Sequence, residues 1–87
     1  KGESSNVILK ADTVSARYIK SQPIHDSQTI LKETKDSTHF ELKLLISEEL
    51  IRTILSYGNE IEILEPVELR NIIQDRISGM NSIYKLN

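Results

Sequence analysis

The spacing of apolar residues in the first part of the chain predicts a strand followed by a helix. Residues 7–11 form a short, mostly apolar run with the length of a strand. Residues 14–21 can then form about two turns of helix, and Asp12 or Thr13 offers the side-chain oxygen for its N-cap. Pro23 ends this helix, because the residue before a proline is disfavoured in the helical region.

A β-hairpin is predicted next. Residues 29–33 and 38–46 flank the polar turn 35–37, and a short polar turn between two strand-like runs is typical of a hairpin. The second run alternates with a period of two, which predicts a strand covered on one side only. Its apolar face comprises Phe40, Leu42, Leu44 and Ile46, and its polar face comprises His39, Glu41 and Lys43.

The remaining residues predict a second helix, a fourth strand and a last helix. Ser47 is a favourable N-cap, and Gly58 suits the left-handed position just after a helix. Residues 59–64 alternate again, as in a strand. Pro66 then opens the last helix, which Gly79 destabilises by roughly 1 kcal/mol relative to alanine. The stripe predicted to be buried on this helix comprises Leu69, Ile72, Ile73, Ile77, Met80 and Ile83.

Together these elements predict an α+β domain of the ferredoxin-like kind, with the order βαββαβ and an extra C-terminal helix. Two helices cover one face of an antiparallel sheet, and right-handed crossovers give the strand order 4-1-3-2. We assign residues 7–87 to this domain and residues 1–6 to a linker or a cloning remnant. The predicted core comprises Phe40, Leu42, Leu44, Ile54, Leu55, Ile61, Ile63, Leu69, Ile72 and Ile73.

Composition and charge narrow the classes of function. The 87 residues include 11 basic and 13 acidic ones, which gives a net charge of −2, and the basic residues are scattered. An autonomous duplex-DNA binder needs a basic cluster to neutralise phosphates, so this class is disfavoured. Cysteine is absent, which excludes disulfides, thiolate zinc sites and cysteine nucleophiles.

We expect a cytoplasmic protein with no membrane segment. An apolar stretch such as 44–46 is far shorter than the roughly 20 residues that a membrane helix needs. Residues 1–6 lack the apolar core of a signal peptide. The absence of cysteine suits a reducing compartment, and the missing initiator methionine fits a segment excised from a larger protein.

From Phe40 onward, the sequence resembles the C-terminal extension of WYL-domain regulators, abbreviated WCX. The stretches that carry the resemblance read FELKL from Phe40, ELIRTILSYG from Glu49 and IEILEPVELR from Ile61. An earlier loop, His-Asp-Ser-Gln at residues 25–28, is similar to a His-Pro-Ser-Gln loop of the family, with Asp26 where proline is common. The resemblance covers roughly residues 16–84.

The resemblance implies a regulatory function. In that family, an N-terminal helix-turn-helix domain binds DNA, a WYL barrel senses a ligand, and the ferredoxin-like extension helps in ligand binding, dimer contacts or both. We therefore expect upstream WYL and helix-turn-helix domains in the same chain, a homodimer of the full-length protein, and a nucleotide or nucleic-acid effector. The alternative is a homo-oligomerisation module that does not touch the ligand.

Four residues are candidate ligand contacts. The guanidinium of Arg70, one turn into the last helix, could hold a phosphate or carboxylate, and the alternative is an ion pair with Glu65 or Glu68. The other three are His25 and Gln28, in the polar loop before the second strand, and Arg17, on the helix that leads into it. Local capping by Asp26 and Ser27 is the alternative to ligand binding by this loop.

We expect no catalytic residue, metal or cofactor. His25 and His39 lack helical i, i+4 spacing and a third ligand, so they give only a weak metal signal. There is no Gly-x-Ser-x-Gly sequence and no glycine-rich phosphate loop. A small enzyme of the acylphosphatase kind would need an anion-binding loop with an arginine after the first strand, where this chain has only Asp12 and Thr13.

Overall fold

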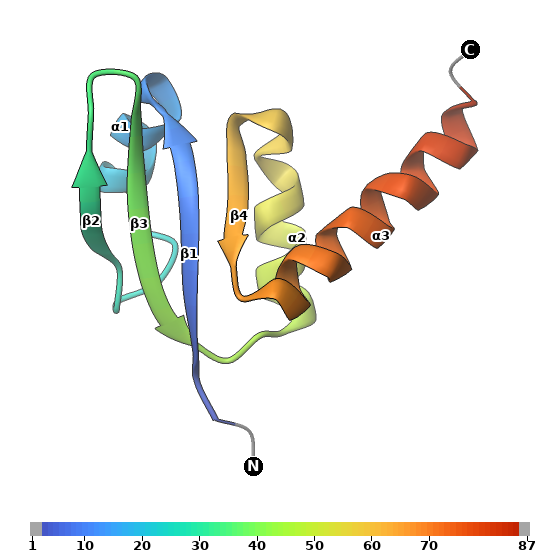
Figure 1. Ribbon diagram of the computed structural model, residues 1–87, viewed down its shortest axis with the longest axis horizontal. Coiled ribbons are helices and arrows are strands. Elements are labelled where there is room, and N and C mark those ends of the chain that lie inside the picture. The colour runs from blue at the N-terminus through green and yellow to red at the C-terminus, as the bar shows by residue number, and fades with distance from the viewer. Residues whose placement is uncertain (1–2, 86–87) are drawn as a thin grey trace.

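Residues 3–85 are described by the computed structural model, in which four strands and three helices follow one another along the chain (Figure 1). The predicted α+β class with an antiparallel sheet is confirmed. The elements are β1 (Ser5–Asp12), α1 (Thr13–Ser21), β2 (Thr29–Glu33), β3 (Ser37–Leu44), α2 (Glu48–Ser56), β4 (Ile61–Glu65) and α3 (Val67–Tyr84), with a short 3-10 turn at Gly58–Glu60.

The strands lie in the order β2-β3-β1-β4, and every neighbouring pair is antiparallel. Read from the opposite edge, this is the sequence 4-1-3-2. Helix α1 connects β1 to β2, and β3 lies between these two strands in the sheet. Helix α2 connects β3 to β4, and β1 lies between those two strands. Each of these two helices therefore connects strands that are not adjacent in the sheet.

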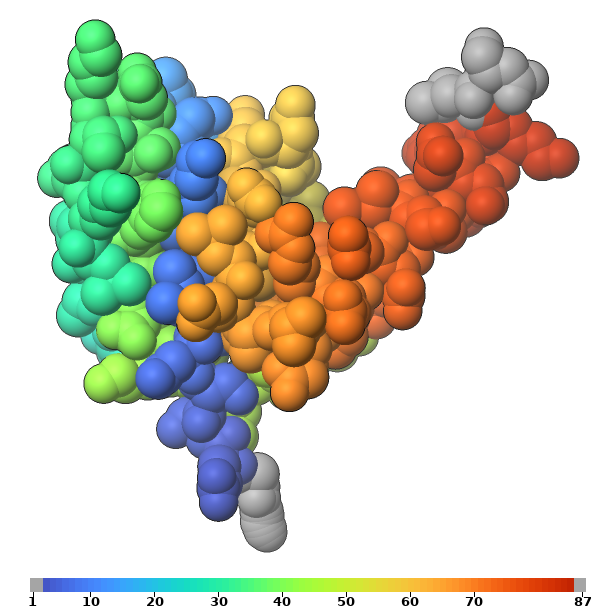
Figure 2. All heavy atoms as spheres, viewed as in Figure 1, coloured from blue at the N-terminus to red at the C-terminus, as the bar shows by residue number. Residues whose placement is uncertain are grey.

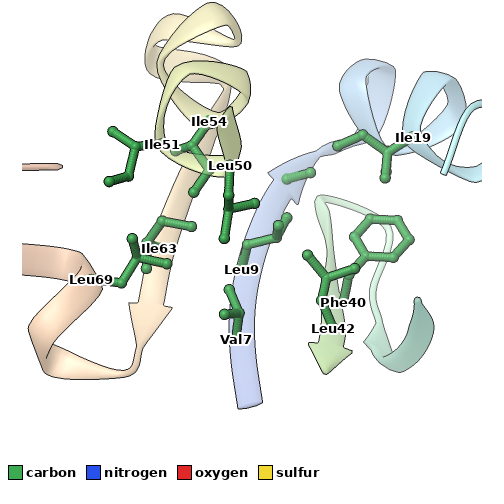
Figure 3. Close-up of a cluster of buried hydrophobic side chains, with 12 residues drawn as sticks. Val7, Leu9, Ile19, Phe40, Leu42, Leu50, Ile51, Ile54, Ile63 and Leu69 are labelled. Carbon is green, nitrogen blue, oxygen red and sulfur yellow. The ribbon is translucent and has the colours of Figure 1, made fainter. Parts of the chain in front are cut away.

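The alternation of side chains along the two central strands creates the core. Val7, Leu9 and Ala11 of β1 are buried, as are Phe40 and Leu42 of β3. Figure 3 shows these strands facing the helices through one layer of apolar side chains. From the helices, the buried core residues are Ala16, Ile19, Leu50, Ile51, Ile54 and Leu69.

The predicted core is correct for half of its members. Phe40, Leu42, Ile54, Ile63 and Leu69 are buried. The other predicted residues are only partly buried and pack against the edge of the core: Leu44, Leu55, Ile61, Ile72 and Ile73. The first strand and helix contribute much of the centre, because β1 lies between β3 and β4 in the sheet.

Several strand boundaries differ from the prediction. β4 begins at Ile61, because Asn59 and Glu60 belong to the 3-10 turn before it. β1 begins at Ser5, so Ser5 and Asn6 pair with β3 although they had been assigned to a linker. β3 ends at Leu44, and Ile46 lies beyond it in the loop before α2, although it was predicted to end that strand. An alternating pattern shows which residues could pair but not where the neighbouring strand stops.

Three predicted helix ends are confirmed, whereas Pro66, predicted in the first turn of the last helix, is the extended N-cap residue before it. The Asp12 carboxylate accepts a hydrogen bond from the Ser15 backbone N–H at 2.7 Å, and the Ser47 hydroxyl oxygen accepts one from the Leu50 N–H at 3.1 Å. Gly58 follows α2 with a φ of +61°, in the left-handed region that favours glycine. These contacts fix where α1 and α2 begin and where α2 stops.

The last helix is the main departure from the prediction. Ile77, Met80 and Ile83 were expected to be buried, but 53%, 49% and 79% of their surfaces are exposed. Figures 1 and 2 show the second half of α3 projecting away from the sheet. The helix is about 27 Å long at 1.5 Å per residue. Its first turns pack against β4, and its hydrogen bonds to α2 reach as far as Arg76. Periodicity identified the apolar face correctly, but could not tell whether anything in this domain covers it.

Candidate functional site

A concavity of about 570 Å³ lies at the end of the sheet near Ser4. The loop before β2 contributes His25, the segment after β3 contributes Leu44 and Leu45, and α2 contributes Thr53. Leu45 is more than half exposed and presents apolar surface beside these polar groups. The concavity therefore combines an apolar wall with hydrogen-bonding groups.

The loop fixes the orientation of the His25 ring. The Ser27 backbone N–H donates to His25 Nδ1 at 3.1 Å, and the Ser27 hydroxyl lies 2.8 Å from the same nitrogen. The Ser27 hydroxyl oxygen in turn accepts a hydrogen bond from the Lys43 N–H of β3 at 2.8 Å. Because Nδ1 accepts, the neutral ring carries its proton on Nε2. The loop is thus anchored to the sheet, and the Nε2–H of His25 has no partner among residues 3–85.

Gln28 holds the same loop against α1. Its side-chain oxygen accepts from the Ile24 N–H at 2.9 Å, and its side-chain nitrogen donates to the Ile19 carbonyl at 3.1 Å. Both ends of the amide are therefore used within the domain. Arg17 is exposed on α1, and within residues 3–85 its side chain has no hydrogen bond or ion pair. It lines neither the concavity nor the groove beside α3.

Arg70 lies in a different place from the other three candidates. Its Nη1 donates to the Glu62 carboxylate at 2.8 Å and to the Ile63 carbonyl at 2.7 Å. The hydrogen bond from Arg70 lowers the pKa of Glu62 below its usual range. An ion pair was the alternative expected for Arg70, but its partner is Glu62 on β4 and not Glu65 or Glu68. The contact joins α3 to the edge strand.

An apolar groove of about 370 Å³ runs between the end of α2, β4 and α3. Figure 2 shows the hollow between the projecting helix and the body of the domain. Arg70 is one of the residues that line it. The apolar side chains of its walls are Ile54, Leu55, Ile61, Ile73, Ile77 and Met80. The four predicted contacts are therefore not assembled into one site: His25 lines the concavity, and Arg70 lines this groove.

A comparison with models of protein families finds a match over residues 5–80, to the model described as WCX domain. The chain belongs to the WCX domain family. The match covers most of the chain, so the family predicted from the sequence is confirmed. This family is associated with WYL-type regulators, in which it forms a C-terminal module. No curated protein matches the chain significantly.

In this WCX domain, an ion cluster links α3 to α2. Arg76 donates two hydrogen bonds to the Glu48 carboxylate, at 3.0 and 2.7 Å, and Arg52 donates a third at 3.1 Å. Glu48 is the first residue of α2, so the cluster links the start of α2 to the middle of α3. The hydrogen bond from Arg76, followed by that from Arg52, lowers the pKa of Glu48 to about 2.

We expect this cluster to release α3 in acid. A carboxylate whose pKa is depressed in the folded protein stabilises it above the unfolded pKa, and this contribution is lost as the pH falls through the folded value. The contribution of Glu48 should therefore be complete above pH 4.5 and disappear as the pH approaches 2. A carbon-13 NMR titration of the Glu48 carboxyl checks this: Arg76→Ala should raise its midpoint, whereas an unchanged midpoint would contradict the cluster.

Sequence reasoning missed this cluster and one aromatic contact. The i, i+4 spacing of Glu48 and Arg52 could have revealed their pair. Arg76 is 28 residues from Glu48, and nothing in the sequence brings them together. Tyr18 of α1 and Tyr57 after α2 lie with ring centroids 6.4 Å apart, a contact that also needs the tertiary structure.

Neither a metal cluster nor a membrane helix is found among residues 3–85. No three His, Asp or Glu side chains in this part of the WCX domain are grouped so that they could hold a metal ion. None of its helices is long and apolar enough to span a bilayer. His25 and His39 therefore stand apart from any third ligand within the described residues.

Proposed function

We propose that this WCX domain is the C-terminal regulatory module of a bacterial, cytoplasmic WYL-type transcription regulator, and that it completes or gates an effector site formed with the preceding WYL domain. We further propose that its βαββαβ order is a ferredoxin-like arrangement. The observation that carries the functional proposal is the concavity beside Ser4, because a preceding domain would join the chain at this end of the sheet.

The chemistry of the concavity supports a shared site. His25 offers its Nε2–H, Thr53 a hydroxyl, and Leu44 and Leu45 an apolar wall. Among residues 3–85 no Lys or Arg lines it, and Glu49 does, so we expect a phosphate group to draw its positive charge from outside this part of the chain, for example from the WYL domain. For a nucleotide or nucleic-acid effector, this favours contact between the WCX domain and the base rather than the phosphate.

We also propose that the domain is not an enzyme and works without a cofactor. Ser27 and His25 are hydrogen-bonded, like the serine nucleophile and histidine base of a hydrolase. However, the Ser27 hydroxyl oxygen also accepts a hydrogen bond from the Lys43 backbone N–H. The pair therefore has a structural reason to exist, which is to anchor the loop to β3. Arg70 is likewise occupied by Glu62, although an effector carboxylate could compete for it.

The effector proposal is tested with His25→Ala in the full-length regulator. Operator DNA is selected in vitro, and its affinity is measured with and without nucleotides and short single-stranded oligonucleotides as probes. We expect His25→Ala to weaken the response to the active probe by roughly 5-fold or more, the lower end of a typical coupling. DNA affinity without a probe should stay nearly unchanged.

A matched control for this test is His39→Ala, which removes a histidine from β3 outside the concavity. Arg17→Ala, Gln28→Ala and Arg70→Ala complete the set of candidate contacts. An unchanged response in His25→Ala and these three variants would discard the proposed site. A response lost equally in His39→Ala would indicate general damage to the domain and contradict a specific role for His25.

The isolated chain is expected to bind duplex DNA only non-specifically, with a dissociation constant of roughly 10⁻⁴ M or weaker at physiological salt. The reason is its net charge of −2 and the absence of a basic cluster. Fluorescence anisotropy with labelled operator DNA measures this directly. A sub-micromolar, sequence-selective complex would show that the domain itself reads DNA and would contradict the proposed division of labour.

The second candidate function is homo-oligomerisation of the regulator, with no ligand contact by this domain. The exposed apolar side chains on the second half of α3 favour it, because contiguous apolar surface usually marks an interaction site. The two candidates involve different surfaces of the domain, the concavity near Ser4 and the groove beside α3, and they are compatible with each other.

A further inference from the structure

The concavity near Ser4 presents two polar groups of opposite kind to a ligand. His25 lines it from the loop before β2, and Glu49 lines it from the first turn of α2. The carboxylate of Glu49 only accepts hydrogen bonds. Among residues 3–85, the Glu49 side chain has neither a hydrogen bond nor an ion pair, so its oxygens are not used by this part of the chain. A ligand that contacts Glu49 therefore has to bring hydrogen-bond donors.

Ser27 fixes what His25 offers to the same ligand. The Ser27 backbone N–H donates to His25 Nδ1 at 3.1 Å, and the Ser27 hydroxyl lies 2.8 Å from the same nitrogen. Because that hydroxyl oxygen accepts from the Lys43 N–H, its own proton is available for Nδ1. Both contacts keep Nδ1 as an acceptor, and the ring donates through Nε2. A ligand that contacts His25 therefore has to bring an acceptor.

The rest of the concavity suits an uncharged ring. Its volume of about 570 Å³ lies within the range of roughly 300–1,000 Å³ that is typical of small-molecule sites. Ile24, Leu44 and Leu45 supply apolar surface. Apart from His25, Glu49 is the only ionisable residue among residues 3–85 that lines the concavity. A neutral group with N–H donors therefore fits it better than an anionic group.

Among the common nucleobases, guanine matches these two contacts. On its Watson–Crick edge the O6 acceptor is followed by two donors, N1–H and the 2-amino group. Two neighbouring N–H groups allow a carboxylate to bind in a bidentate manner, as it does with arginine. Adenine and cytosine have one donor on this edge, their amino group, and uracil and thymine have one, their N3–H. None of these four bases places an acceptor beside two donors.

We propose that the concavity binds a guanine base, with the His25 Nε2–H donating to O6 and the Glu49 carboxylate accepting from N1–H and the 2-amino group. The base belongs either to a free guanine nucleotide or to a single-stranded nucleic acid. In this arrangement Ser27 is a positioning residue, because it acts on the base only through His25. This inference rests on the proposed effector site and names the chemical group that the site recognises.

Binding of guanosine and inosine monophosphates to the full-length regulator, measured by calorimetry, tests the proposal. The two nucleotides differ only in the 2-amino group that Glu49 is proposed to bind. We expect the guanine nucleotide to bind about 10-fold more tightly, which is the discrimination that one hydrogen bond to a charged group typically provides. A second pair of probes, short oligothymidines with one central guanine or hypoxanthine, identifies a single strand as the source of the base if only this pair binds.

Two variants separate the two contacts. Glu49→Gln should bring the affinities for guanine and hypoxanthine together, because the amide nitrogen of glutamine meets a donor of the base. Ser27→Ala should weaken the binding of both bases by a similar factor, because both carry O6. An effect of Ser27→Ala that is confined to guanine would contradict the contact between His25 and O6.

Glu68→Gln is the matched control, because Glu68 is an exposed glutamate in the first turn of α3, outside the concavity. It should keep the preference for guanine. Equal affinities for guanine and hypoxanthine, or a preference that survives in Glu49→Gln, would overturn the guanine site. In that case a shift of operator affinity by any of the probes would leave the effector proposal standing. If no probe binds and none shifts operator affinity, the effector proposal fails together with this inference.

Discussion

Replacing Leu42 by alanine is expected to lower the free energy of unfolding by about 2–5 kcal/mol. Leu42 is fully buried on β3, beneath the helices and next to β1, so the truncated side chain leaves a cavity that the surrounding strands cannot readily fill (Figure 3). A domain of this size has only about 5–15 kcal/mol of stability in total. Urea unfolding followed by circular dichroism should therefore show a large decrease in the midpoint concentration.

Leu31→Ala is the matched control for this prediction. Leu31 lies on β2, an edge strand whose residues are all exposed, so the same truncation should change the free energy of unfolding by less than about 0.5 kcal/mol. Leu42→Asp gives a sharper contrast, because it would place a charge in the core. A folded, stable Leu42→Asp variant would mean that the strand presents its other face to the helices.

The second large effect is expected for Leu69→Ala. Leu69 is completely buried in the first turns of α3 and points toward Ile63 of β4 (Figure 3). Its truncation should also reduce stability by about 2–5 kcal/mol. The loss should be local at first, because Ile72 and Ile73 are only partly buried and cannot hold the helix by themselves. Amide hydrogen exchange should become faster in α3 before it does in β1 and β3.

Val67→Ala serves as the control within the same helix, since Val67 is exposed and its truncation leaves no cavity. Its exchange rates should match those of the wild type. Uniform acceleration of exchange across the whole domain in Leu69→Ala would contradict the view that α3 is attached separately through its first turns. It would instead mean that the helix and the sheet unfold as one unit.

The sheet could be predicted from the sequence because local chemistry determines most of it. Alternation along residues 38–44 identified the buried face of β3, and Asp12, Ser47 and Gly58 marked helix ends through contacts with their own neighbours. Each of these signals acts through residues a few positions away and therefore determines the local structure by itself. The same is not true of α3, where an apolar stripe predicts burial but does not identify the covering surface.

The candidate site was harder to predict for the same reason. The polar loop at residues 25–28 was recognised, and local bonding within it was foreseen as an alternative. The partner of Arg70 was not predicted, because Glu62 on β4 comes close to Arg70 only when α3 packs on the sheet. Long-range ion pairs, such as Arg76 with Glu48, depend on the angle of a helix that no local pattern determines.

The most direct test of the regulatory role compares the full-length regulator with a version lacking residues 7–87. Affinity for the selected operator is measured with and without the nucleotide or single-stranded oligonucleotide that shifts it in the intact protein. An effector changes DNA affinity only through its different affinities for the two states of the regulator. We predict that the shortened protein, dimerised by a fused coiled coil, still binds the operator but no longer responds to the effector. An unaltered response without the domain would contradict its proposed role.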